Sequence, residues 1–253
     1  TDTFLGAGGD FANPTSAASV AADGYAQVIV GGTLLSTTTY FMEYPEDVQL
    51  VGLSFATTVG STALSGEVNH KMDMPLQINA TQLMTTVLTG SAANAGLASS
   101  TLDAEVAAIG LGGTVDGYRL FNVSQAQVTA IQFFDRALGS DRITFVGEVG
   151  YTFIHDFDEG DNAIKFGRAD YFDSPQTTEG FVTQSAWGYR TMLQGEYSDT
   201  IFGINLTPTI AWSHDVKGFA PQPGGAFSER QKSMDLSLGA DYLSIYKASL
   251  SYT

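Results

Sequence analysis

Hydrophobic and polar positions alternate most clearly between residues 184 and 213. In residues 184–197, the odd positions 187, 189, 191, 193 and 197 carry Trp, Tyr, Thr, Leu and Tyr, and the even positions are mostly small or polar. In residues 201–213, apolar Phe202, Ile204 and Ile210 alternate with small and polar residues in the same way. Successive side chains of a β-strand point to opposite faces, so a period of two indicates strands. The pattern predicts a β-hairpin that turns at residues 198–200.

The length of these arms favours a membrane protein. Each arm has about 13 residues, whereas soluble strands average about 5–6 and a tilted membrane strand needs about 9–11. Aromatic residues lie at both ends of the arms, as in the two aromatic girdles of an outer-membrane barrel. We therefore predict a membrane girdle that contains Tyr151, Phe153, Trp187, Tyr189, Tyr197, Phe202, Trp212, Tyr242 and Tyr246.

The same alternation predicts further strands along the chain. They lie at residues 48–59, 62–72, 119–134, 143–153, 233–242 and 246–252, with shorter candidates at 25–30 and 37–43. Gly60 and Ser61 form a two-residue turn between the first two.

The connections between these strands are short and long in turn. Short connections follow residues 59, 135, 198 and 242, and long ones cover 73–117, 155–183 and 214–231. Outer-membrane barrels have short periplasmic turns and long extracellular loops. Residues 73–117 are expected to be a loop insert with helices at 78–88 and 101–109, the first capped by Asn79 or Thr81. Such an insert serves as an ordinary surface loop or, alternatively, as a plug or lid.

The fold class that follows is all-β, an antiparallel transmembrane up-and-down β-barrel of the outer-membrane type. Residues 1–253 are taken as one barrel domain. The last predicted strand would run outward, whereas bacterial barrels have an even strand number and both ends in the periplasm. We therefore expect these residues to be an incomplete portion of a larger barrel.

Composition changes this picture in three ways. Only 15% of the 253 residues are charged, against about 25% in soluble proteins. There is no cysteine, which excludes disulfides and thiolate metal sites. The formal net charge of −16 argues against nucleic acid as a partner, because phosphate binding needs a basic surface.

Along each predicted strand, every second position carries mostly polar residues. The charged and amide side chains at these positions are candidates for the lumen of a barrel. They are Glu67, Asn69, Lys71, Glu148, Arg190, Gln194, Glu196, Asp235 and Lys247. In a barrel they would set solute selectivity; alternatively, they only pair across strands in a filled interior. The Gly/Pro-rich loop 214–231, with Phe219 and Phe227, is a candidate for a constriction or a ligand gate.

Catalytic and metal-binding patterns are weak. Ser213, His214 and Asp215 are adjacent, but a catalytic triad needs geometry rather than adjacency, and strand neighbours point to opposite faces. We therefore predict no enzyme activity and no cofactor. The carboxylates of Asp156, Asp158, Glu159 and Asp161 form a candidate calcium site, although their spacing does not match a known Ca²⁺ loop and a solvated loop is the default.

Several separated motifs resemble a proteobacterial outer-membrane family catalogued as domain of unknown function 1302. They are YFMEYPEDV at 40–48, GLSF at 52–55, GEV at 66–68, MPLQ at 74–77, VGEVG at 146–150, HDV at 214–216 with Gly218, the Pro/Gly segment 221–227, and LSYT at 250–253. The resemblance covers the C-terminal part of that family, and residues 1–39 do not contribute to it. It implies a longer barrel protein and no catalytic residues.

The sequence thus predicts a bacterial outer-membrane channel or uptake porin for small organic or hydrophobic molecules. Its partners would be the lipid bilayer and a small-molecule solute, and either a homo-oligomer or a hetero-oligomer is compatible with the pattern. Two alternatives stay open. One is a structural or adhesive barrel that binds partners through its extracellular loops, and the other is a secreted soluble β-sandwich.

Overall fold

The fold is one antiparallel sheet with two helices at one end. The computed structural model describes residues 38–93, 96–110, 112–167, 180–221 and 227–253. Its strands are β1 (Gln49–Val59), β2 (Thr62–Gln77), β3 (Tyr118–Asp135), β4 (Arg142–Ile154), β5 (Ser185–Ile201), β6 (Ile204–Lys217), β7 (Lys232–Tyr242) and β8 (Tyr246–Tyr252), and its helices are α3 (Ala80–Thr89) and α4 (Ser100–Ile109).

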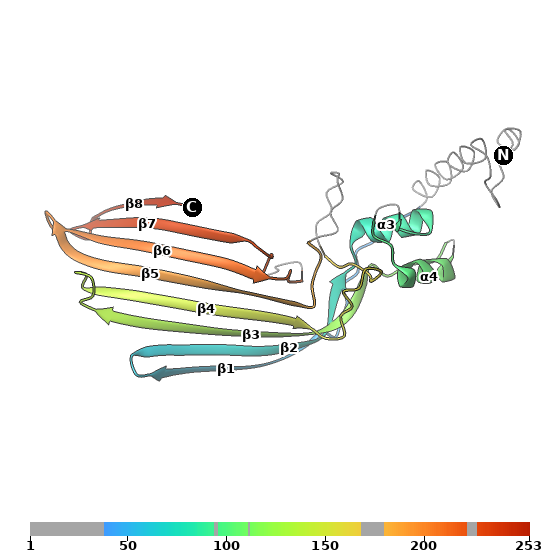
Figure 1. The fold of residues 1–253 in the computed structure, drawn as a ribbon, viewed down its shortest axis with the longest axis horizontal. Coiled ribbons are helices and arrows are strands. Elements are labelled where there is room, and N and C mark those ends of the chain that lie inside the picture. Colours follow the sequence, from blue (N-terminus) through green and yellow to red (C-terminus); the bar gives the residue numbers. More distant parts are fainter. Residues whose placement is uncertain (1–37, 94–95, 111, 168–179, 222–226) are drawn as a thin grey trace, which may run out of the picture.

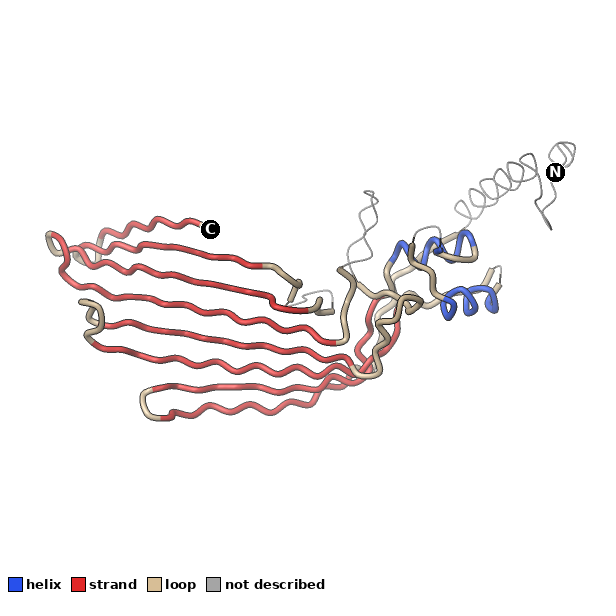
Figure 2. Tube along the Cα trace, viewed as in Figure 1, coloured by secondary structure: helices blue, strands red, loops and turns tan. Residues whose placement is uncertain are grey.

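The strands follow one another across the sheet in chain order, from β1 to β8. Every neighbouring pair is antiparallel, as predicted for an up-and-down sheet. All four short turns lie at one end, and the long connections lie with the helices at the other (Figures 1 and 2). Within the described residues the sheet is open, with β1 and β8 as its two edges. No helix among these residues is long and apolar enough to cross a membrane.

One predicted turn and one predicted strand need correction. The β5–β6 hairpin turns at Phe202 and Gly203, with φ of 53° and 80°, and not at 198–200. Both central residues of a type I′ hairpin turn need positive φ, so the turn lies where that conformation is adopted. Of the strand predicted at 37–43, the described residues 38–43 form no strand, because residues 38–48 have no regular structure. The one predicted at 25–30 lies outside the described residues.

Strand β2 also continues beyond its predicted end at Met72, up to Gln77. A bulge between Lys71 and Met74 interrupts the pairing with β3. A bulge inserts an extra residue on one strand and changes which parity faces each side. The alternation in the sequence is therefore interrupted although the strand continues. The insert between β2 and β3 therefore starts at Ile78 rather than at residue 73.

Both predicted helices form, each with a side-chain cap. Asn79 accepts a hydrogen bond from the backbone N–H of Gln82 at the start of α3, one of the two caps that the sequence predicts. Ser99 accepts from the backbone N–H of Leu102 at the start of α4, and Asp103 lies in its first turn. Such caps satisfy amide groups that have no partner within the helix.

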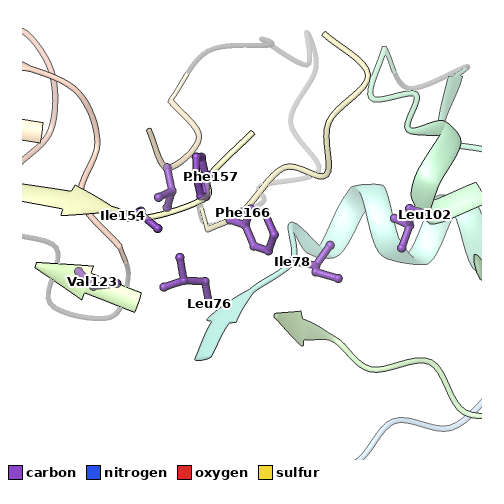
Figure 3. Close-up of a cluster of buried hydrophobic side chains, with 8 residues drawn as sticks. Leu76, Ile78, Leu102, Val123, Ile154, Phe157 and Phe166 are labelled. Atoms are coloured by element: carbon purple, nitrogen blue, oxygen red, sulfur yellow. The ribbon is translucent and has the colours of Figure 1, made fainter. Parts of the chain in front are cut away.

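The hydrophobic core lies at the end of the sheet that carries the long connections, not along the sheet (Figure 3). Leu76, Val123 and Ile154 come from the ends of β2, β3 and β4. Ile78 and Leu102 come from the insert, and the remaining members are Phe157, Phe166 and Val182 from the next long connection. This core fixes the helices and the described residues 155–167 and 180–182 against the ends of the strands.

The apolar face of the sheet is uncovered in the described structure. Its central positions include Leu53, Val68, Val149 and Ile210, which are 50–81% exposed. Paired residues share a face, and Val68, Leu53 and their cross-strand neighbours form a row across the sheet. Monomeric soluble proteins rarely expose an apolar patch beyond a few hundred Å².

Candidate functional site

The strand register places all nine polar residues predicted for a lumen on one face. One row runs from Glu67 through Gln127, Gly150 and Gly188 to Asp215, and the next contains Thr129, Glu148 and Arg190. The remaining predicted residues share this parity, and they are Asn69, Lys71, Gln194, Glu196, Asp235 and Lys247. We call this side the polar face.

Several polar-face groups hydrogen-bond or pair with their neighbours. The carboxylate of Glu148 accepts from Nε2 of Gln127 at 2.9 Å and from the hydroxyl of Thr129 at 3.2 Å. Nζ of Lys247 lies 3.9 Å from Oδ2 of Asp241. Each contact joins adjacent strands, so part of the predicted selectivity set also stabilises the sheet.

Phe227 covers the polar face near the end of the sheet that carries the long connections. Gly150 and Gly188 pair directly across β4 and β5, and their missing side chains leave room for this ring. A Cβ on either glycine would lie 2.9 Å from a ring atom of Phe227. The ring is 5% exposed, and the guanidinium of Arg190 lies 6.0 Å from its centroid. Phe227, which follows β6 in the chain, therefore lies over the polar face, and the constriction stays a prediction.

Asp215 holds this loop in place. Its Oδ2 accepts the backbone N–H of Ser228 at 2.9 Å, and its Oδ1 lies 3.8 Å from Nη2 of Arg190. The backbone of Asp215 also accepts from Arg230 N–H and donates to Gln231 carbonyl oxygen, each at 2.9 Å. Asp215 is 7% exposed, and a buried carboxylate needs such partners.

His214 points to the other face, as strand alternation predicts. Its ring contacts Tyr189 and Trp212 at centroid distances of 5.6 and 6.5 Å. The three adjacent residues Ser213, His214 and Asp215 therefore do not assemble a catalytic triad. Ser213 instead exchanges a 2.8 Å hydrogen bond with Ser233 on the neighbouring strand.

The predicted girdle residues lie on the apolar face in two groups, with Phe202 in the adjoining turn. Tyr151, Phe153, Trp187, Tyr189 and Trp212 lie towards the long connections. Tyr197, Tyr242 and Tyr246 lie near the short turns, where Tyr242 and Tyr246 stack at 6.4 Å. Nε1 of Trp212 donates to the hydroxyl of Tyr189 at 3.3 Å. The rows between the two groups contain Leu193, Ile210 and Leu236, together with Phe145 and small residues.

A histidine pair on the apolar face was not predicted. Nδ1 of His70 and Nε2 of His155 lie 2.9 and 2.8 Å from the hydroxyl oxygen of Ser124. The imidazole rings are 5.3 Å apart, and Phe153 packs edge-on against His155. His70 lies on β2 and Ser124 on β3, and His155 directly follows β4. Because these residues are far apart in sequence, their contact could have been predicted only from the strand register.

The four acidic residues of the 156–161 segment do not form a metal site in the described residues. Oδ1 of Asp158 accepts the backbone N–H of Gly160 at 2.8 Å, and Oε1 of Glu159 accepts that of Gln184 at 2.7 Å. Within the described part of the chain, no group of three or more His, Asp or Glu side chains is arranged to hold a metal ion. Asp158 and Glu159 thus order the loop by local hydrogen bonds.

Comparison with known proteins gives one match. The protein family described as "Protein of unknown function (DUF1302)" matches residues 15–253. No curated protein and no solved structure matches the chain.

Proposed function

The chain belongs to the DUF1302 family of proteins of unknown function, and because that membership assigns no activity, we propose a function from the geometry. The chain forms part of a β-barrel in the bacterial outer membrane. The polar face lines a conduit for small organic or hydrophobic solutes. The apolar face contacts lipid, and the short-turn end lies towards the periplasm.

The observation that carries this proposal is the division of one long-stranded sheet into an exposed apolar face and a polar face. Leu53 is 81% exposed and Val68 58%, yet both belong to a continuous row of apolar side chains. Burying such a surface in lipid would be favourable, by a free energy of about 25 cal/mol for each Å² removed from water. In hydrocarbon, backbone groups must pair within the protein, which an antiparallel sheet does except at its edges. The outer edges of β1 and β8 would therefore have to be paired in the membrane.

The polar face supplies what a conduit needs. Glu148 pairs with Arg190 across β4 and β5, and Glu67 and Lys71 lie on the same face of β2. Such mixed charge favours general permeation over strong ion selectivity. Phe227 lies above Gly150 and Gly188 and would narrow the passage there. An aromatic ring beside the passage would favour solutes with apolar surface over inorganic ions.

Two other functions are less well supported. A soluble β-sandwich needs a second sheet packed against the apolar face, and the described residues contain one sheet only. A structural or adhesive barrel would use its long connections for partners. Those described instead pack onto the sheet ends and over the polar face, through Phe166 and Phe227.

Reconstitution into planar bilayers and liposomes tests the proposal. We expect conductance, and uptake of small organic solutes by liposomes, from the wild-type protein. Phe227→Ala removes the ring above the glycine pair and should raise the conductance. Phe145→Ala is the matched control, because Phe145 lies on the apolar face and its loss should leave the conductance unchanged.

Each negative outcome points to a different function. A protein that inserts but gives neither conductance nor solute uptake would be a structural or adhesive barrel. A protein that stays monodisperse without detergent would be a soluble sandwich.

A further inference from the structure

A cavity of about 420 Å³ opens between the long connections. It lies between segments 157–165, 180–183, 219 and 229–230. Three hydrogen bonds join these segments: Val182 N–H to Phe166 carbonyl oxygen at 3.0 Å, Thr183 N–H to Phe219 carbonyl oxygen at 3.1 Å, and Phe219 N–H to Thr183 hydroxyl at 2.8 Å. Ligand pockets for small organic molecules have volumes of about 300–1,000 Å³. The cavity is therefore large enough for a ligand of one ring and a short chain.

Part of its lining is apolar. Phe157, Phe181 and Phe219 contribute aromatic rings, and Ile164 and Val182 contribute aliphatic side chains. Phe157, Phe181 and Val182 are 6–8% exposed, so they form a fixed wall. A ligand with an aromatic or aliphatic body would bury its surface here.

The charged side chains in the lining differ in how well they are paired. Glu159 accepts Gln184 N–H at 2.7 Å, and Asp158 accepts Gly160 N–H at 2.8 Å. Glu229 accepts Gly218 N–H at 2.9 Å and lies 3.6 Å from Nε of Arg230. All three carboxylates therefore already have a protein donor.

Lys165 has the least satisfied charge of the cavity. Its ammonium group donates to the carbonyl oxygen of Gly160 at 2.8 Å, and no carboxylate among the described residues pairs with it. An ammonium group has three donors, and Lys165 is partly buried. The backbone of Lys165 is fixed on both sides, by Gln82 Oε1 at 2.7 Å and by Asn79 N–H at 2.7 Å.

We propose that this cavity binds small amphipathic monocarboxylates, with the carboxylate on Lys165 and the apolar body against Phe157, Phe181 and Phe219. The exposed carboxylates of Asp158 and Glu159 border the site and disfavour a ligand with a second negative charge. This inference rests on the proposed function, because it names the solutes that the conduit would collect at its long-loop end.

Isothermal titration of the detergent-solubilised protein tests it with three probes. They are 3-phenylpropionate, its neutral analogue 3-phenylpropan-1-ol, and the dicarboxylate phenylsuccinate. We expect saturable binding of 3-phenylpropionate, at least about tenfold tighter than binding of the other two, the size of effect that one charge-assisted hydrogen bond gives. Equal binding of the acid and the alcohol by the wild-type protein would overturn the proposal, as would an absence of saturable acid binding.

Variants of Lys165 locate the site. Lys165→Met should remove the preference for the acid over the alcohol, whereas Lys232→Met, an exposed lysine outside the cavity lining, should leave it unchanged. If Lys165→Met abolishes binding of both ligands, Lys165→Arg decides: retained acid binding supports the site and lost acid binding overturns it. A Lys165→Met protein that still prefers the acid also overturns it.

Binding and transport can fail separately in these experiments. Titration measures equilibrium binding in micelles, and the bilayer experiments measure passage. Binding without conductance would support the ligand site and contradict the conduit. Conductance without binding would support the conduit and contradict the ligand site.

Discussion

Gly150 and Phe227 are in such close contact that a Cβ on the glycine would lie 2.9 Å from Cζ of the ring. The glycine is on β4, and the phenylalanine is in the connection between β6 and β7. This contact joins β4 on the polar face to Phe227 above it. The position of Phe227 therefore depends on the absence of a Cβ methyl group at residue 150.

Gly150→Ala should therefore displace Phe227 and loosen the 218–231 loop. We expect the free energy of unfolding to fall by about 1–3 kcal/mol, as for overpacked sites, with faster proteolysis in this loop and higher conductance. Gly239→Ala is the control, because a Cβ there would lie at an ordinary 3.6 Å from Thr207. Equal effects of the two variants would show that Phe227 does not depend on Gly150.

Two neighbours on β3 test whether one face contacts lipid. The chain has no cysteine, so a single introduced cysteine reports one position. Gln127 on the polar face and Val128 on the apolar face are both exposed. In proteoliposomes, Gln127→Cys should react with a charged maleimide and Val128→Cys should not. Equal labelling of the two would exclude a lipid-covered apolar face.

The two tryptophans give a second test that needs no labelling. Trp187 and Trp212 lie on the apolar face, in the aromatic group near the long connections. Aromatic girdles lie at the membrane interface. Lipids brominated near the headgroup should therefore quench the fluorescence of both tryptophans more than lipids brominated at the end of the acyl chain. Trp212→Phe should retain this depth dependence for Trp187. An absence of quenching by either lipid would place both side chains away from the bilayer.

Gln82 should control the order of the loops. Its buried side chain donates to Leu97 carbonyl oxygen at 2.8 Å and accepts from Lys165 N–H at 2.7 Å. Gln82→Met keeps the volume but leaves both groups without these partners, at a cost of about 1–3 kcal/mol for an unsatisfied buried group. Hydrogen exchange at the Lys165 amide should speed up. Met84→Ala on the same helix, at a 45% exposed position, should not change it.

Stability at low pH should depend on Asp141 in the β3–β4 turn. Hydrogen bonds from the hydroxyl and the backbone N–H of Ser198 lower the pKa of this carboxyl below its ordinary 3.8. A lowered folded-state pKa gives a stabilisation that is present above the unfolded-state pKa and is lost as the pH falls through the folded-state value. Asp141→Asn should thus melt at a lower temperature than wild type at pH 6, and the difference should shrink below about pH 4.

Ser198→Ala provides the matched variant for this pH effect. It removes the hydroxyl and keeps the backbone N–H, which donates to Oδ2 of Asp141 at 2.8 Å. The pH-dependent difference between Asp141 and its Asn variant should become smaller in this background. A difference that persists unchanged down to pH 2 would mean that ionisation of Asp141 is not its source.

Local alternation was sufficient to predict most of the sheet. The turn at Gly60–Ser61, the strands around it and the caps of α3 follow from residues close in sequence. The polar face could also be predicted, because parity within each strand is a local property and the short turns fix the register between strands.

The errors occur where the backbone departs from regular alternation. Phe202 continues the apolar alternation of its arm, yet it occupies a turn position with φ of 53°, which its side chain does not signal. The bulge after Lys71 shifts the parity of β2, so the motif that ends at Gln77 resembled a loop. Neither departure is visible without the partner strand.

The candidate site could be predicted only in part. Phe227 was a candidate for the constriction, but its place above Gly150 depends on a contact between residues far apart in sequence. The Lys165 cavity could not be anticipated, because residues of two separate long connections build it. Loops lack the periodicity from which spatial neighbours can be deduced.

The hydroxyl between His70 and His155 carries a single proton, and this limits the tautomers of both rings. If Ser124 donates to Nε2 of His155, then Nδ1 of His70 must be the protonated nitrogen that donates to Ser124, and the reverse arrangement exchanges these roles. When both imidazoles are neutral, only one of the two facing nitrogens can accept from that hydroxyl. Both rings therefore share one tautomer, Nδ1–H in the first arrangement and Nε2–H in the second, and nitrogen chemical shifts should report the same tautomer for His70 and His155. Ser124→Ala would remove this coupling, so that each ring adopts its tautomer independently of the other.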